Sequence, residues 1–378
     1  RRLADLQLEK QFGIRAGDSK PRGMAAPQSG KPATGVKTAP SLAAGTQGNA
    51  SRESDKDFEQ RATAASDFSS ESGNASPAGL VPGIADPAGP LEAIALYEKL
   101  LKDYPSYENS DQVLYQMSRA YDELGRTEEA MATMERLLQA NPHSVHFDEV
   151  QFRRGEYYFT RRKYRDAENA YTAVIGLGAK SEYYELALYK LGWTFYKQDL
   201  YDEALLKYVA LLSYKVTVGN DLDKSHDKDE EPCFSDTFRV VSLSFSNLGG
   251  PTAIRDFFTT NGHRSFEDRI YSNLGEHYLA KLRYDDAAKT FKTFVELNPF
   301  HRQAPRFSMR VIETFTQGGF PKLVLEAKRE FASQYGLKAA YWQHFKPEET
   351  PEVLAYLKSN LKDLATHYHA EYQATEDA

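Results

Sequence analysis

The stretch "LGWTFYKQDLYDEALLKY", Leu191 to Tyr208, places a small residue, an aromatic residue, an alanine and a second aromatic residue at set distances. The four positions are Gly192, Phe195, Ala204 and Tyr208. Two interpretations fit this pattern: a single amphipathic hairpin of two helices, or a unit that is copied along the chain. Only a copied unit repeats the same spacing elsewhere, so the rest of the sequence decides between them.

The spacing recurs upstream. Ala204 has counterparts in Ala167, Ala130 and Ala93, and 204 − 167 = 167 − 130 = 130 − 93 = 37. The other positions of the unit recur at the same interval: Tyr208, Tyr171, Met134 and Tyr97; Phe195, Tyr158 and Tyr121; Gly192, Gly155 and Ser118; Pro142 and Pro105. The stretch is therefore one copy of an internal repeat, which indicates an array of identical supersecondary units.

Packing explains the residue types of the unit. A small residue in the first helix lets the second helix approach closely, and the alanine of the second helix accepts the aromatic residue of the first. We expect the later aromatic residue to fill the space to the next unit. Proline then stops the second helix, since it lacks a backbone N–H and clashes with the preceding turn.

This order of small, aromatic, alanine, aromatic and proline residues resembles the tetratricopeptide repeat. The usual period of that repeat is about 34 residues, whereas the alanines here lie 204 − 167 = 37 apart, and the extra residues fall between units, as in "YPSYENSDQ". The resemblance implies an all-α solenoid of helical hairpins that binds other proteins.

The array continues less regularly toward the C-terminus. The stretch "YSNLGEHYLAKLRYDDAAKTFKTFVELNP", Tyr271 to Pro299, is the best later match, and its Ala287 lies 287 − 204 = 83 residues after Ala204. The interval holds an acidic insertion, "GNDLDKSHDKDEEP", and a degenerate helical pair around "FRVVSLSFSNLGGPTAIRDFF". Another divergent hairpin follows Pro299, and "PEVLAYLKSNLKDLATHYHAEY" is predicted to be a helix that caps the solenoid.

Composition changes near residue 90. Residues 13–90 are rich in Gly, Ala, Ser, Pro and Thr and cannot bury enough apolar surface to offset chain entropy, so we predict a disordered tether over 13 to about 88. Residues 1–12 are either a frayed terminus or the end of a coiled coil. The predicted organisation is a tether (1–90), regular repeats (91–218), an acidic insertion (219–233), and divergent repeats with a capping helix (234–378).

Net charge, hydropathy and cysteine content exclude several classes of protein. The net charge of −7, from 47 basic and 54 acidic residues, argues against a nucleic-acid binder. No apolar run is long enough to span a membrane, and the single cysteine excludes an intrachain disulfide. Because the chain begins with Arg1, a signal peptide could already have been removed.

We find no motif for catalysis or for a metal. The motifs H-E-x-x-H and G-x-S-x-G and a phosphate loop are absent from the sequence. His367 and His369 lie two residues apart and so point to different faces of a helix. The insertion begins like a calcium-binding loop, but His226 stands where glycine is needed and Pro232 where glutamate is needed. We therefore predict no catalytic residue, cofactor, metal site or small-molecule substrate.

The partner-binding surface is predicted on the first helices, which line the concave face of such solenoids. The spacing of Tyr189, Trp193 and Tyr196 makes one helical stripe, and Phe152 and Phe159 make a second in matching register. We expect these exposed aromatic residues to hold an apolar partner segment, with basic residues nearby to contact its acidic side chains. The candidate residues are Tyr115, Arg119, Phe152, Glu156, Phe159, Tyr189, Lys190, Trp193, Tyr196 and Lys197. The alternative is that several of them pack between units or under the N-terminal tether.

A closer resemblance is carried by "YYELALYKLGWTFYKQDLYDEALLKY" and "ALYEKLLKDYPSYENSDQVLYQMSRAYDELG". These stretches resemble the Tol-Pal coordinator family of bacterial cell-envelope proteins and the lipoprotein repeat subunit of the outer-membrane β-barrel assembly machine. The resemblance covers residues 91 to about 215 and, less well, 268–299; the acidic insertion and the last 80 residues have no counterpart in those families. It implies a periplasmic or outer-membrane-associated adaptor in a complex for envelope assembly, motility or secretion. The alternative is a cytoplasmic scaffold that organises a signalling or enzyme complex.

Overall fold

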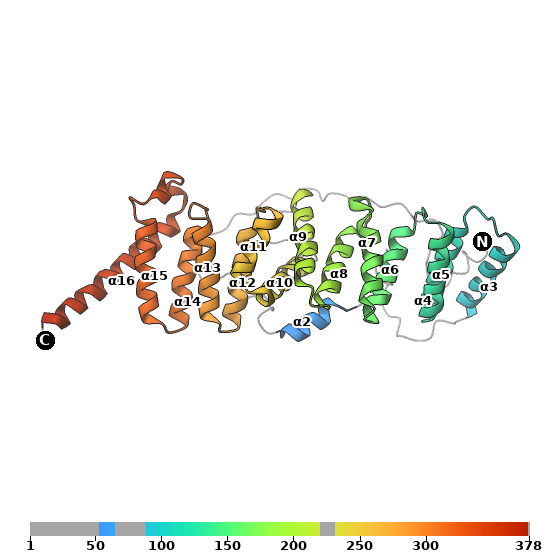
Figure 1. The fold of residues 1–378 in the computed structure, drawn as a ribbon, viewed down its shortest axis with the longest axis horizontal. Helices are drawn as coiled ribbons and strands as arrows, with labels where there is room; N and C mark the ends of the chain where they lie inside the picture. The colour runs from blue at the N-terminus through green and yellow to red at the C-terminus, as the bar shows by residue number, and fades with distance from the viewer. Residues whose placement is uncertain (1–52, 65–87, 220–230, 377–378) are drawn as a thin grey trace, which may run out of the picture. The chain divides into compact units, whose positions relative to one another are not determined.

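A computed structural model describes residues 53–64, 88–219 and 231–376, and all regular elements within these ranges are helices (Figure 1). The described helices confirm the predicted all-α fold of repeated hairpins. The chain divides into two compact units, of which the N-terminal one ends at Thr194 and the C-terminal one begins at Phe195.

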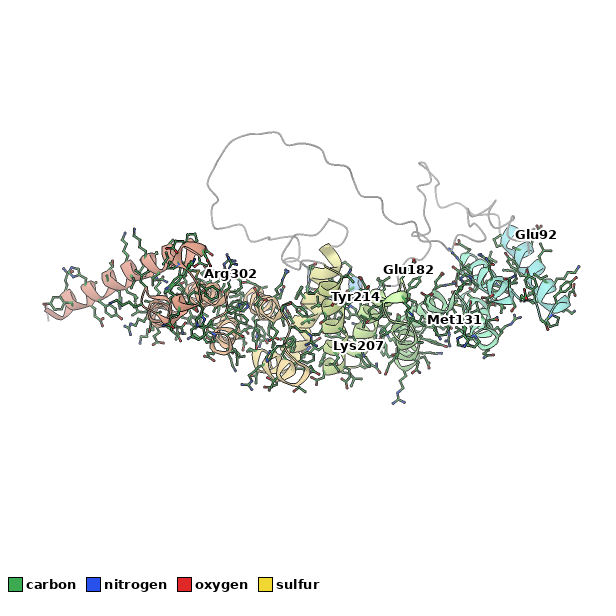
Figure 2. The ribbon with its side chains drawn as sticks, turned by 90° about the horizontal axis from the view of Figure 1, so that it is seen from above. Glu92, Met131, Glu182, Lys207, Tyr214 and Arg302 are labelled. Carbon is green, nitrogen blue, oxygen red and sulfur yellow. The ribbon has the colours of Figure 1, made fainter. Side chains whose placement is uncertain are left out.

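The predicted period appears in where the helices begin. The first helices of the regular units begin at Ser110, Phe147 and Tyr184, and 147 − 110 = 184 − 147 = 37. The second helices begin at the same interval. The elements are α3 (Ala88–Asp103), α4 (Ser110–Glu123), α5 (Thr127–Ala140), α6 (Phe147–Thr160), α7 (Tyr164–Ile175), η2 (Gly178–Lys180), α8 (Tyr184–Tyr196) and α9 (Tyr201–Thr217). Side chains fill the spaces between successive helices (Figure 2), and the labelled Met131 lies on the buried face of α5.

The C-terminal unit keeps the period in its middle. Its elements after α9 are α10 (Glu231–Leu248), α11 (Pro251–Asn261), α12 (Glu267–Ala280), α13 (Tyr284–Leu297), α14 (Ala304–Gln317), α15 (Pro321–Tyr335), η3 (Ala340–Gln343), η4 (Pro347–Glu349) and α16 (Pro351–Glu376). From α12 to α14 the starting residues differ by 304 − 267 = 37, and from α13 to α15 by 321 − 284 = 37. The long α16 contacts α15 and α14, and its buried apolar residues Val353, Leu357 and Leu364 share one face.

The predicted boundary of the acidic insertion, 219–233, is wrong at its C-terminal end. Helix α10 already begins at Glu231. Pro232 is compatible with this because a proline in the first turn loses no intrahelical hydrogen bond, and acidic residues are favourable at a helix N-terminus. Residues 220–230 lie outside the described residues, and with them most of the sequence that resembles a calcium-binding loop.

A missing Cβ atom sets how closely the two helices of a hairpin approach. A Cβ placed on Gly155 would lie within 3.0 Å of the Tyr171 ring, and one on Gly275 would meet the Phe291 ring in the same way. The register is the same in both units, since 171 − 155 = 291 − 275 = 16. The later aromatic residue therefore covers the glycine of its own hairpin. Phe291 also reaches Phe307 of the next unit, with ring centroids 5.8 Å apart, as the sequence predicted. The repeat alanines have no exposed surface: Ala93, Ala130, Ala167, Ala204 and Ala287.

The hairpin turns share one left-handed residue. Positive φ angles occur at intervals of 37 residues in both units: Gly125, Arg162, Asp199, and again Leu282 and Gly319. The backbone N–H of the next residue donates to a carbonyl five residues earlier, as from Lys163 to Tyr158 at 2.9 Å and from Arg283 to Tyr278 at 2.9 Å. This is the Schellman pattern that ends helices, so each hairpin turn begins with a C-cap of one type.

The segment predicted to be a disordered tether contains a helix, α2 (Asp55–Ala62), which corrects that prediction for these residues. The Asp57 N–H donates to the Ser54 Oγ at 3.2 Å, and the Ser54 hydroxyl donates to Asp57 Oδ2 at 2.7 Å. Ser54 is therefore the N-cap of α2, and acidic residues in the first turn with Arg61 in the last turn suit the helix dipole. The rest of the predicted tether, 13–52 and 65–87, and residues 1–12 lie outside the described residues.

Of the helices in the described ranges, none is both long enough and apolar enough to cross a membrane.

We expect Gly155→Ala to destabilise the N-terminal unit by about 1–3 kcal/mol, because the added methyl group overpacks the contact with Tyr171. Urea unfolding measures the change. The matched control is Gly176→Ala, where φ is −60° and the nearest atom to a new Cβ is 3.4 Å away. The control should leave stability unchanged or raise it by up to about 1 kcal/mol. Equal losses in the two variants would contradict the packing role of Gly155.

We expect Leu282→Gly to raise stability by about 0.5–1 kcal/mol. Leu282 is 70% exposed and has φ 58°, so glycine relieves backbone strain and removes little packing. The reverse change at the same register, Gly319→Ala, should lower stability by about 1 kcal/mol or more. Thermal unfolding of both variants tests this pair, and a destabilised Leu282→Gly variant would show that the turn carries no strain.

Candidate partner-binding surface

The structure places the candidate residues on the first helices, as predicted, but not as exposed stripes. Arg119 and Lys197 are partly exposed, and the other eight are buried: Tyr115, Phe152, Glu156, Phe159, Tyr189, Lys190, Trp193 and Tyr196. The prediction of exposed aromatic stripes is therefore wrong. The contacts of these residues fall into four groups, which show what covers them.

Tyr115 and Phe152 pack between repeats. The Tyr115 ring stacks on His146 at 3.9 Å between ring centroids, and Phe152 stacks on Tyr183 at 5.3 Å. The two pairs occupy one register, since 152 − 115 = 183 − 146 = 37. The Tyr115 hydroxyl also donates to Glu149 at 2.6 Å. Each ring on a first helix is thus covered by a ring from the approach to the next first helix.

The surroundings of the Tyr115 stack shift two pKa values. Burial, together with the charge of Glu149, raises the pKa of Tyr115 to about 12. Burial lowers the pKa of His146, which disfavours the charged form of its ring. Both effects fit a packed contact between repeats.

Phe159 and Tyr196 pack at hairpin turns. The Phe159 ring contacts Tyr164 edge-on at 5.7 Å in the N-terminal unit, and Tyr196 contacts Tyr201 at 5.3 Å in the C-terminal unit. The registers agree, since 196 − 159 = 201 − 164 = 37. These two aromatic residues therefore hold the end of a first helix against the start of a second one.

Glu156 and Lys190 form a buried ion pair. Lys190 Nζ lies 3.1 Å from Glu156 Oε2, and the side chains are only 5% and 8% exposed. The Tyr171 hydroxyl donates to the other carboxylate oxygen at 2.5 Å, and burial, with the charge of Glu156 second, raises the pKa of Tyr171 well above its usual value. Both oxygens of the buried carboxylate are thus paired, as burial of a charge requires.

The same register carries an ion pair in the C-terminal unit. Arg310 lies 2.5 Å from Glu276, and 310 − 276 = 190 − 156 = 34. Those side chains are 32% and 50% exposed. A related contact was not predicted from the sequence: Arg153, 37 residues before Lys190, pairs with Asp122 and donates to Ser118 at 3.3 Å. The repeat period could have revealed it, because Arg153 and Lys190 occupy one position of the unit.

Tyr189 and Trp193 remain, and together with Lys190 of the buried ion pair we call them the Trp193 site. The Trp193 ring contacts Tyr189 edge-on at 6.3 Å and packs on Phe58 of α2 at 5.7 Å. Lys190 Nζ donates to the backbone carbonyl of Ala64, just after α2, at 2.9 Å. Helix α2 therefore lies on α8 at this site (Figure 1).

Phe58 is the anchor of α2. It has no exposed surface, and no other described residue of this helix is buried. Full burial of such a side chain contributes about 1.5–3 kcal/mol, while an isolated helix of this length is marginal in water. Contact with α8 therefore stabilises α2. The sequence contains a local signal for this helix that its overall composition does not show: the N-cap residue Ser54, with Asp57 three residues later, directly before a large apolar residue.

Sequence comparisons identify the repeat. Residues 90–150 and 152–213 each match a sequence model described as a tetratricopeptide repeat. No curated protein matches the chain. Among solved structures, a tetratricopeptide repeat protein from Parabacteroides merdae is 11% identical, with 73% of this chain and 94% of that chain covered and a TM-score of 0.32. A chain of the APC/C hetero-tetramer Cut9-Hcn1 is 13% identical, with 72% and 52% covered and a TM-score of 0.21.

The chain thus contains tetratricopeptide repeats, and this class of protein typically serves as a non-catalytic scaffold for protein–protein interaction. The fold alone does not name a partner. The contacts at the Trp193 site are the features that bear on what the scaffold binds.

We expect Lys190→Ala to cost about 3–5 kcal/mol, because it leaves the Glu156 carboxylate buried without its cation. Arg310→Ala removes the matching cation from a half-exposed pair and should cost about 1 kcal/mol or less. Urea unfolding, with hydrogen exchange to assign the change to a unit, compares the two variants. Similar losses at both positions would show that burial does not distinguish these pairs.

Proposed function

We propose that this protein is a scaffold that captures a short helical segment of a partner protein at the Trp193 site. The observation that carries the proposal is the seat of α2, where an aromatic side chain packs on Trp193 and a backbone carbonyl accepts from Lys190. A surface that binds one short helix in this way has the features of helix-in-groove recognition, an apolar anchor and a polar contact at its edge.

Of the candidate residues, Tyr189, Lys190 and Trp193 are thus proposed to contact the partner. The other candidates support them indirectly. The stacks of Tyr115 and Phe152 and the Glu156 carboxylate set the spacing of the first helices that carry the site. A binding residue held by packed neighbours keeps its geometry, which lowers the ordering cost of association.

We expect Trp193→Ala to weaken capture of the partner about thirtyfold or more, since truncation of a central aromatic anchor commonly costs about 2 kcal/mol or more in binding. Affinity capture on the immobilised full chain, with mass spectrometry, names the partner, and titration of the purified partner gives the affinities. Leu186→Ala is the matched control, because Leu186 lies on the same helix and is 38% exposed. Circular dichroism and thermal unfolding check that both variants fold. Normal binding by a folded Trp193→Ala variant would contradict the proposed site.

We further propose a cell-envelope setting, as an adaptor in a periplasmic or outer-membrane-associated complex. The support is the resemblance of residues 91 to about 215 to envelope repeat proteins and the order of a low-complexity segment before the repeats. Fractionation of source cells with an antibody to the chain tests this setting. Recovery in the cytosolic fraction would contradict it and favour the alternative of a cytoplasmic scaffold for a signalling or enzyme complex.

A further inference from the structure

We propose that α2 is a built-in ligand of the Trp193 site: the resting chain fills this site with its own helix, and a partner segment of the same chemistry must displace it. The inference rests on the proposed function, because it assigns a regulator to the same site. Three features of the structure carry it: the single anchor of α2, its contact with Lys190, and the length of chain that connects it to the repeats.

Phe58 makes the contact between α2 and the Trp193 site specific, and it also allows α2 to dissociate readily. Phe58 and Trp193 have no exposed surface, while the remaining described residues of α2 are exposed or partly exposed. A core helix of a solenoid buries a whole stripe of side chains, as α4 does with Val113, Met117 and Tyr121. A helix that buries only one of its described side chains can open without unfolding the repeats, which is how locally unstable elements behave.

Lys190 connects the docked helix to the charge network of the repeats. Its ammonium group donates both to the Ala64 carbonyl at 2.9 Å and to Glu156 at 3.1 Å. The matching pair Arg310–Glu276 remains about half exposed in the C-terminal unit, whereas Glu156 and Lys190 are buried where the α2 segment contacts Lys190. A displacing segment therefore has to supply a carbonyl or carboxylate oxygen to Lys190 as well as a ring to Trp193.

The connection to the repeats allows docking within one chain. Between Ala64 and Ala88 lie 88 − 64 − 1 = 23 residues, which can span up to about 75–80 Å when extended. The five steps from α3 to α8 cover at most about 40–50 Å at ordinary helix spacings. A link of this length is therefore long enough to connect the two, and it makes docking unimolecular, so a partner competes against a ligand that is covalently attached to the same chain.

The sequence of α2 indicates which residues a displacing partner segment should contain. The segment "ESDKDFEQRATA", residues 53–64, contains the short helix Asp55–Ala62, with an N-terminal cap, acidic residues in its first turn and one aromatic residue on the buried side. We infer that the partner presents a similar short helix, with one large aromatic anchor preceded by acidic residues. Trp193 then contacts the aromatic side chain of the partner segment, and Lys190 contacts a carbonyl at the C-terminal end of its helix.

Hydrogen exchange in the full chain tests whether Phe58 holds α2 on the site. Phe58→Ala should raise exchange at the α2 amides about thirtyfold or more, the effect usual for loss of a central aromatic anchor. Trp193→Ala should do the same, and the double variant should add little, because both remove one contact. Gln60→Ala is the matched control on the exposed face of α2 and should leave exchange unchanged. Unchanged exchange in Phe58→Ala would overturn the proposal.

A peptide of residues 53–64 tests whether α2 blocks the site. Labelled at its N-terminus, it should bind the full-length Phe58→Ala chain at least about thirtyfold more tightly than the wild-type chain, because only the variant leaves the site open. The same peptide with alanine at position 58 should not bind. Equal binding to both chains, or binding to neither, would overturn the proposal.

Two further measurements distinguish docking within one chain from docking between two chains, and failure of this proposal from failure of the proposed function. Light scattering should give the same mass for wild type and Phe58→Ala; a wild-type dimer that Phe58→Ala converts to a monomer would overturn docking within one chain. Once a partner is captured, Phe58→Ala should strengthen its binding, whereas Trp193→Ala should weaken it. If the partner binds Trp193→Ala normally, the proposed function fails while the exchange and peptide results still establish α2 as a ligand of this site.

Discussion

The close approach of two helices at a glycine is the constraint on which the rest of the structure depends. Where Gly155 faces Tyr171, and Gly275 faces Phe291, the ring occupies the space that a Cβ atom would need. That contact fixes the distance and the register of the two helices in a hairpin. The left-handed residue of the turn, 162 or 282, lies seven residues after the glycine in both cases and returns the chain at the required angle. A hairpin built this way can be copied, because the contact between its glycine and its ring lies within the unit.

Because the units repeat at a constant period, residues at fixed sequence separations meet between successive units. Positions 34 residues apart on successive first helices meet in the Glu156–Lys190 pair and again in Glu276–Arg310. Positions 31 residues apart meet in the stacks of Tyr115 on His146 and Phe152 on Tyr183. These contacts occupy most of the aromatic residues that a simple view of the first helices would offer to a partner. Among the candidates, the Trp193 site is the place where a segment from outside the repeats is seated.

When a segment of the same chain fills a binding site, docking of that segment regulates how strongly a partner binds. Helix α2 combines a strong local cap with a single buried ring, so it forms readily on the surface of α8 and leaves without a large loss of core. Any partner then binds with its intrinsic affinity reduced by the fraction of chains in which the site is open. Changes to residues 53–64, whether by sequence or by modification, would alter that fraction without touching the repeats.

The sequence by itself determined the period, the helical hairpins and the buried alanines, because these follow from residue size at fixed intervals along one chain. It also located Trp193 and Lys190 on a first helix. It did not determine which aromatic residues would be exposed: Phe152 and Tyr115 look alike in the repeat whether they face solvent or a ring of the next unit, and only the packing of adjacent units placed Tyr183 and His146 over them. The docking of α2 was also decided by tertiary structure. Composition correctly indicates that residues 53–64 cannot build a core of their own, but Phe58 is buried in a space that residues far along the chain, at 190 and 193, provide.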